Sequence, residues 1–185
     1  MMERKYWNFN LKVRSSYQMI KVKRATEEHV EGISRVCSVA CYATYEGIRS
    51  YENIKRNNER FYNHKRITDE LEESNGWDGY IVALDEEEVV GAIGGGMTGE
   101  NKSEIYVLYL HPTRRGEGIG SQLLQYLTDI QKNKGSTEQW VSVQKGNKKG
   151  IPFYQTKGFT SHSERMAYSN SSEEDYVSIR YVRTI

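Results

Sequence analysis

The chain has 185 residues, enough for one domain of ordinary size with its own core and short for two. Hydrophobic residues make up 37% and charged residues 28%, the mean hydropathy is -0.77, and no run approaches a membrane-spanning length, so an integral membrane protein is excluded. The net charge of +1 gives no general attraction to nucleic acid.

Residues 1–18 show no sustained hydrophobic periodicity and are expected to be a flexible N-terminal extension. No apolar segment follows Arg4 and Lys5, so a secretory signal peptide is not expected and the cytoplasm is the expected location. Lys and Arg are common in positions 1–24, but no interleaved aromatic pattern follows, which favours a solvated extension over a nucleic-acid-binding arm. Residues 19–185 are expected to form the domain.

An alternating stretch begins at Met19 and predicts a half-exposed strand. Thr26 then has the residue type of a helix N-cap, and apolar residues follow it at spacings of three and four. This helix includes Cys37 and Cys41, which are expected to be small core residues and not a disulfide framework. The four histidines are scattered and have no partner at a ligand spacing, so no metal is expected.

Residues 45–75 are strongly charged, with helical pieces expected near 51–62 and 64–74. Tyrosines gather around this region, and a tyrosine combines apolar area with a polar tip, so the group can line a pocket. Scattered tyrosines on surface helices are the commoner case and are favoured here. The tyrosines concerned are Tyr42, Tyr45, Tyr51 and Tyr62.

Two strands are expected over 80–84 and 89–97, joined as a hairpin. Three consecutive glycines, 94–96, fall within the second strand. Because glycine packs no side chain in a ladder, they suggest a bulge or a close approach by another backbone or a ligand.

The stretch Glu104–Ser121 combines a strand pattern over 104–110 with alternating glycines and an amphipathic helix over about 118–134. A glycine-lined turn lets an anion approach the backbone, and the unpaired N–H groups of a helix start point at it. The segment therefore predicts a phosphate site. Neither the P-loop nor the dinucleotide fingerprint matches, because no Lys-Ser pair follows Gly120 and that third glycine comes one residue early.

The next strand is expected over 139–143, which makes a parallel pair with a right-handed crossover. Pro152 is tolerated only in a first turn, so a helix of about two turns should begin near Gly150. A closing pair of strands is expected over 159–168 and 176–182.

The glycine loop has the form Arg/Gln-x-x-Gly-x-Gly/Ala, in Arg115-Gly-Glu-Gly118-Ile-Gly120. Downstream, the segment from Asn147 through Tyr154 to Phe159 has the form Asn-x6-Tyr-x3-Gly-Phe. Both segments resemble the GNAT superfamily of N-acetyltransferases, and the resemblance covers residues 19–185. It implies a single α/β domain with a mixed, mostly antiparallel, splayed sheet flanked by helices, and acetyl-CoA as the acetyl donor.

The resemblance also implies which residues hold the donor. The backbone of Leu108, Tyr109 and Leu110 would hydrogen-bond the pantetheine arm, and Asn147 would bind the cofactor arm near its β-alanine part. The pyrophosphate would be bound by Arg115, Gly116, Glu117, Gly118, Ile119, Gly120 and Ser121, where the positive end of the helix also favours it.

Tyr154 would be the general acid of the family. The leaving thiolate has a solution pKa of ~8.5 and a phenol one of ~10, so a tyrosine can donate a hydrogen bond or a proton to it. The alternative is that Tyr154 is an amphipathic core residue; the motif context favours catalysis.

The general base is less clearly indicated. An attacking amine with a pKa of ~10.4 must lose a proton, so a base or a water relay is expected. Ribosomal-protein N-terminal acetyltransferases carry a glutamate where this chain has Ser142, and many relatives carry a carboxylate at the position of Tyr106. Glu104 would point to the same face as Tyr106 and is the chosen base, against a solvated carboxylate at a strand start. His111 is a further candidate.

The implied function is transfer of an acetyl group to a primary amine of a small molecule or peptide by direct attack, without an acyl-enzyme. The alternatives are a non-catalytic acyl-CoA-binding or sensing module and a protein N-terminal or lysine acetyltransferase. Acidic residues within 169–175 either attract a cationic amine or form a solvated hairpin tip, the favoured interpretation. No membrane partner is expected, nucleic acid is not favoured, and a homodimer is left open.

Overall fold

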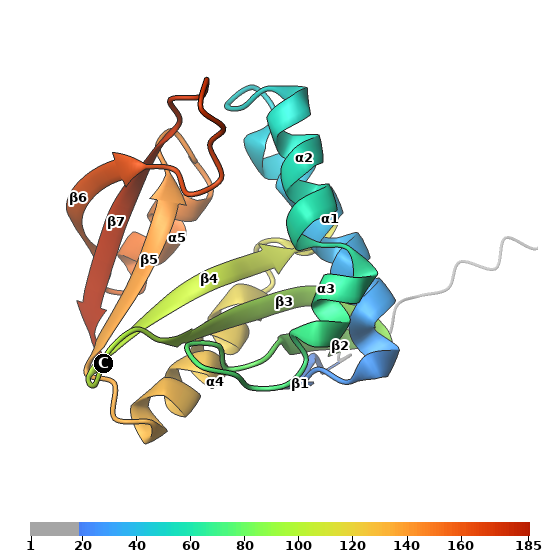
Figure 1. Ribbon diagram of the computed structural model, residues 1–185. Coiled ribbons are helices and arrows are strands. Elements are labelled where there is room, and N and C mark those ends of the chain that lie inside the picture. Colours follow the sequence, from blue (N-terminus) through green and yellow to red (C-terminus); the bar gives the residue numbers. More distant parts are fainter. Residues whose placement is uncertain (1–18) are drawn as a thin grey trace, which may run out of the picture.

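Seven strands form one mixed sheet in the computed structural model, which describes residues 19–185 (Figure 1). The strand order is β1-β2-β3-β4-β5-β7-β6. All neighbouring pairs are antiparallel except β4 and β5, which run parallel. The expected mixed, mostly antiparallel sheet is thus confirmed. The predicted extension, 1–18, lies outside the described residues.

The elements agree with the sequence patterns in type and order, with ends that differ by a few residues. The strands are β1 (Lys21–Arg24), β2 (Ile81–Asp85), β3 (Glu88–Met97), β4 (Lys102–Leu110), β5 (Glu138–Gln144), β6 (Thr160–Met166) and β7 (Val177–Thr184). The α-helices are α1 (Val30–Tyr45), α2 (Tyr51–Phe61), α3 (His64–Asp69), α4 (Ile119–Asn133) and α5 (Gly150–Thr156). Short 3-10 turns cover Glu27–His29 and Pro112–Arg114.

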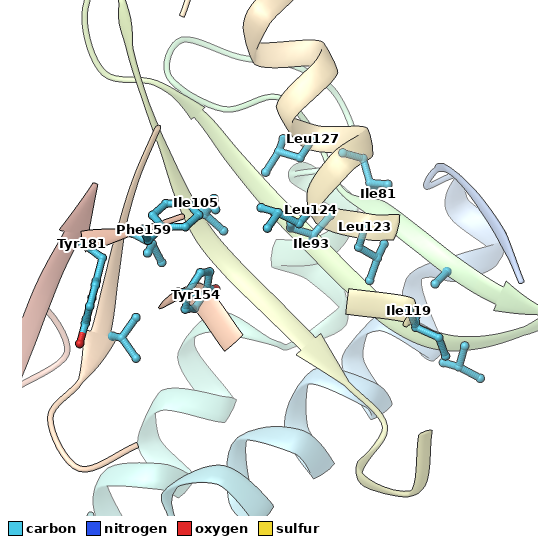
Figure 2. Packing of buried hydrophobic residues seen from close by; sticks show 14 residues of the cluster. Ile81, Ile93, Ile105, Ile119, Leu123, Leu124, Leu127, Tyr154, Phe159 and Tyr181 are labelled. Atoms are coloured by element: carbon cyan, nitrogen blue, oxygen red, sulfur yellow. The ribbon is translucent and has the colours of Figure 1, made fainter. Parts of the chain in front are cut away.

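Helices cover both faces of the sheet and bury a separate apolar cluster on each. On one face, Leu123 and Leu127 of α4 pack with Ile93 of β3 and with Tyr154 and Phe159 (Figure 2). On the other face, the apolar stripe of α1 packs against β2 and β3. Cys37 and Cys41 are buried free thiols in that helix, as expected of core residues.

The sheet is split in its middle, between β4 and β5. Their ladder runs from Lys102 opposite Glu138 to Ile105 opposite Val141, and no later pair is formed between the described strands. Both strands continue beyond this point, and in Figure 1 they diverge like the arms of a V. The edge of β4 that faces β5 after Ile105 therefore presents backbone groups that can bind a ligand.

The open end of the V is bridged by polar contacts between α2 and the segment that joins β6 to β7. Figure 1 shows these two segments facing each other. Glu174 accepts hydrogen bonds from Arg56 at 2.6 Å and from Asn53 at 2.8 Å, and the Tyr176 hydroxyl accepts one from the Ser50 N–H at 2.9 Å. The expectation of a solvated acidic tip is wrong for Glu174, whose side chain is 16% exposed.

The three glycines of β3 have the packing role that was predicted for them. A register shift marks a bulge between Gly94 and Gly95. A Cβ on Gly94 would meet the ring of Trp77, and one on Gly96 would meet the backbone of Gly76. The suggested close approach of another backbone is therefore present. The extra residue of the bulge lies in the neighbouring strand, where Tyr106 of β4 has no partner in the β3 register.

Candidate functional site

Two cavities lie on either side of the gap between β4 and β5. The first, here the glycine-loop cavity, has a volume of about 450 Å³ and is lined by the ends of β4 and β5, the loop at 115–120 and α5. The second, the aromatic cavity, has a volume of about 610 Å³ and lies below α2 and the segment after β6. Tyr106, Tyr109 and Ser142 line both, so the two cavities meet where the strands separate.

The glycine loop is shaped by positive backbone torsions. Gly116 has φ +87° and Gly118, the N-cap of α4, has φ +80°, a region that side-chain-bearing residues rarely occupy. Glu117 points away from the cavity and is held by Arg114, with Nε 2.9 Å from each carboxylate oxygen. Arg114 also pairs with Asp85 at 2.7 Å, and it holds the one acid of the loop on the side away from the cavity.

The other loop residues divide between the cavity wall and the core. Arg115 lines the cavity and donates to the Thr44 hydroxyl at 3.1 Å; burial lowers its guanidinium pKa. The side chain of Ile119 is fully buried in the core. Gly120 lines the cavity, and its position leaves a Cβ 3.3 Å from the Phe153 ring. The N–H of Ser121 is already bonded to the Gly118 carbonyl at 3.1 Å, so the earlier N–H groups of the helix start are the better donors for an anion.

Leu108, Tyr109 and Leu110 line the glycine-loop cavity along the unpaired edge of β4. Asn147 also lines it, but its side-chain oxygen is engaged. That oxygen accepts the N–H groups of Lys149 at 3.1 Å and Gly150 at 2.8 Å, which fixes the start of α5. A ligand in the cavity can therefore use the amide nitrogen of Asn147 and not its oxygen.

Tyr154 is both a core residue and part of the cavity wall. Its ring packs edge-on against Phe153 and Phe159, with centroids 5.2 and 5.4 Å away. Burial raises the pKa of its phenol, and the neighbouring Tyr45 raises it further. Tyr154 is thus held as a neutral phenol in the wall of the glycine-loop cavity, in a protonation state that can donate.

Glu104 lines the aromatic cavity together with Tyr106, so the two share a face as predicted. Its carboxylate is 11% exposed and its Oε1 is paired with Arg180 and, at 3.6 Å, with Arg165. The Ser142 hydroxyl lies 3.4 Å from the same oxygen. The position where some relatives carry a glutamate thus holds a serine that contacts a carboxylate from the neighbouring strand.

His111 lies after β4, with its Nδ1 2.8 Å from the Thr113 hydroxyl, and lines neither cavity. It is therefore poorly placed as the base. Among residues 19–185, no group of three or more His, Cys, Asp or Glu side chains is arranged to hold a metal ion. No helix in that range is long and apolar enough to cross a membrane.

Sequence reasoning found only part of the aromatic cavity. Tyr45 and Tyr62 line it, which agrees with the pocket interpretation that was not favoured, whereas Tyr51 is 63% exposed and packs on Tyr42. Further lining residues come from segments far apart in the chain and share no spacing. They are Arg49, Phe61, Arg66, Trp77, Arg165 and Tyr168.

Comparison with known families gives one match over most of the chain. The model of the acetyltransferase (GNAT) family matches residues 42–159. Spermidine N(1)-acetyltransferase of Thermoplasma acidophilum is 29% identical over 142 residues, which cover 76% of this chain and 88% of that protein. Thialysine N-epsilon-acetyltransferase of Sus scrofa is 35% identical over 63 residues, 33% of this chain and 35% of that protein.

Among solved structures, the PaiA N-acetyltransferase of Thermoplasma acidophilum in complex with coenzyme A has a similar fold. The TM-score is 0.76 at 24% identity, and the match covers 90% of this chain and 99% of that one. At this identity the likeness speaks for the fold alone.

Proposed function

Because the chain belongs to the GNAT acetyltransferase family, we propose that it transfers the acetyl group of acetyl-CoA to a primary amine of a small molecule or peptide. The observation that carries the proposal is the meeting of the two cavities at the gap between β4 and β5. A thioester held in one cavity and an amine held in the other can make contact only there. The small amines in the names of the two curated relatives support a small-molecule acceptor over a protein.

The donor would bind in the glycine-loop cavity. Its pyrophosphate would lie against the N–H groups of the loop and the start of α4, where the helix dipole favours negative charge. Its pantetheine arm would follow the unpaired edge of β4 from Leu110 to Leu108, with Asn147 donating from its amide nitrogen. Coenzyme A would then leave by the same cavity.

The reaction would be a direct displacement. The neutral amine nitrogen attacks the thioester carbonyl carbon, an N–C bond forms, and the C–S bond breaks to release a thiolate. The proton lost from nitrogen goes to solvent or a carboxylate. The Tyr154 phenol keeps its own proton and stabilises the leaving thiolate by a hydrogen bond, and the thiolate takes its proton from water as coenzyme A leaves. Tyr154 suits this role because burial keeps it protonated and it lines the cavity wall.

Glu104 would receive the amine proton through a water molecule. Its three charged or polar neighbours, Arg180, Arg165 and Ser142, approach Oε1. The second oxygen, Oε2, would accept from the water. The arginines hold the carboxylate in the wall of the aromatic cavity, close to the gap where the amine must lie.

A non-catalytic acyl-CoA-binding module is not favoured. Such a module needs the glycine-loop cavity alone, whereas this chain also has a cavity of about 610 Å³ on the opposite side of the gap. Polyamines belong in any panel of acceptors because one relative is a spermidine acetyltransferase.

The test measures acetyl-CoA binding and the release of free thiol with a panel of amines. Gly118→Val should abolish tight binding, because a β-branched residue is strained at φ +80° and the loop must rearrange. Gly135→Val is the matched control, since Gly135 has φ +92° at the opposite end of α4. Equal binding by both variants, or no thiol release with any amine, would contradict the proposal.

A further inference from the structure

We infer that the acceptor is a monoamine carried on a flat apolar body, of the arylalkylamine class, and that polyamines are poor acceptors. This inference rests on the proposed function and narrows it. Two properties of the aromatic cavity lead to it, namely the ring surfaces that line it and the balance of charge around it.

The rings come from two sides of the cavity and leave accessible faces. Tyr106 of β4 stacks on Trp77, with centroids 6.3 Å apart and planes 18° apart, and Tyr106 is 49% exposed. Phe61 of α2 lies 6.4 Å from the ring of Tyr168, which is 79% exposed. A flat apolar group that enters the cavity covers these surfaces and gains both burial and ring contacts.

The charged side chains in the wall favour a ligand with few positive charges. Three arginines line the cavity, Arg49, Arg66 and Arg165, against the two carboxylates Glu70 and Glu104. Both carboxylates are already paired. Arg66 Nε lies 2.7 Å from Glu70, and Glu104 is held by Arg180 and Arg165.

Arg49 adds positive charge at the junction itself. It lies over the Tyr45 ring, 4.7 Å from the centroid, and Tyr45 lines both cavities. Its guanidinium donates to the neutral side chains of Gln144 and, at 2.8 Å, Ser169. A cation there disfavours a second ammonium group on the ligand, and it promotes loss of the proton from the amine that must attack.

A polyamine brings several ammonium groups into a wall whose carboxylates are committed to arginines. A monoamine brings one, and that one must become neutral before it displaces the thiolate. The positive charge of the wall therefore disfavours binding of a polyamine and favours deprotonation of a monoamine, while the rings favour a ligand with an aromatic group.

The experiment compares kcat/KM for 2-phenylethylamine, n-butylamine and spermidine at saturating acetyl-CoA, by thiol release. We expect 2-phenylethylamine to exceed spermidine in kcat/KM by about tenfold or more, because only the first gains ring contacts and only the second brings additional positive charges. n-Butylamine, a monoamine without a ring, should fall between them and separate the two contributions.

Substitutions in the wall of the aromatic cavity test which residues cause the preference for 2-phenylethylamine over spermidine. Arg66→Gln leaves the Glu70 carboxylate without its cation and should raise kcat/KM for spermidine relative to 2-phenylethylamine. Arg35→Gln makes the same charge change at an exposed pair with Glu88, neither of which lines the cavity, and should leave the ratio unchanged. Tyr168→Ala should lower kcat/KM for 2-phenylethylamine alone.

A wild-type preference for spermidine would overturn the inference and leave the proposed function standing. So would an Arg66→Gln ratio equal to that of Arg35→Gln. Thiol release with none of the three amines would overturn the inference, whereas only the absence of release across the whole amine panel would overturn the proposed function as well.

Discussion

Gly94→Ala tests whether the absence of a side chain at Gly94 of β3 is what allows Trp77 to pack against the strand. A Cβ at this position would lie 2.9 and 3.0 Å from two atoms of the Trp77 ring and closer still to a third, whereas ordinary contact begins near 3.4 Å. The ring cannot move freely, because its Nε1–H donates to the Glu70 carbonyl at 2.7 Å and Tyr80 packs edge-on against it at 5.0 Å. One added methyl group must therefore strain the strand or displace the ring.

The expected cost follows from overpacking, which destabilises a core by about 1–3 kcal/mol. For a chain of this size each kcal/mol lowers Tm by about 2–4 °C, so the variant should melt about 2–12 °C below wild type. A displaced ring also enters the aromatic cavity, so KM for the amine should rise. The affinity for acetyl-CoA should stay the same, because Trp77 does not line the glycine-loop cavity.

Thermal unfolding, steady-state kinetics and acetyl-CoA titration measure the three quantities. Gly99→Ala is the matched control, since Gly99 lies in the turn after β3 with nothing within 4 Å of an added Cβ. Should Gly94→Ala match Gly99→Ala in Tm and in KM for the amine, the packing argument is refuted.

Variants at three further positions test individual residues. Tyr154→Phe should lower kcat by about 10²-fold at unchanged acetyl-CoA affinity. Because burial raises the pKa of Tyr154, its contribution to stability is present below pH ~10 and is lost as the pH rises above that value. The free energy of unfolding of the variant should therefore fall less steeply with pH in alkali than that of the wild type. Glu104→Gln should cost about 3–5 kcal/mol by stranding Arg180, and adding Arg180→Gln should restore stability in urea titrations without restoring turnover; recovered turnover would exclude Glu104 as the base. Asn147→Ala removes the acceptor of two backbone hydrogen bonds and should lower the free energy of unfolding by about 0.5–2 kcal/mol. Asn147→Asp keeps the accepting oxygen, so it should lower the affinity for acetyl-CoA and leave stability unchanged.

The fold was predictable because its signals are local. The apolar spacing of α4, the alternation of β1 and the position of Pro152 each act within a few residues, so the order and type of the elements followed from them. The glycine loop could be proposed as an anion site for the same reason, since such a site would use consecutive backbone groups.

The aromatic cavity was not predictable in the same way. Trp77, Phe61 and Tyr168 lie on three separate segments, and nothing in their spacing shows that a sheet will bring them together. Glu174 was misjudged because a carboxylate in an acidic stretch resembles a solvated one until Arg56 of another element is known to meet it. Long-range pairing of side chains is the information that a single sequence lacks.

The split between β4 and β5 also bears on the order in which substrates bind and products leave. Since the two cavities lie on opposite sides of the gap, a donor in the glycine-loop cavity and an acceptor in the aromatic cavity would enter by separate routes, and each product would depart the way its precursor came. Neither ligand has to leave before the other enters. Such a site favours kinetics through a ternary complex, in which double-reciprocal plots intersect, over the parallel lines of a ping-pong enzyme.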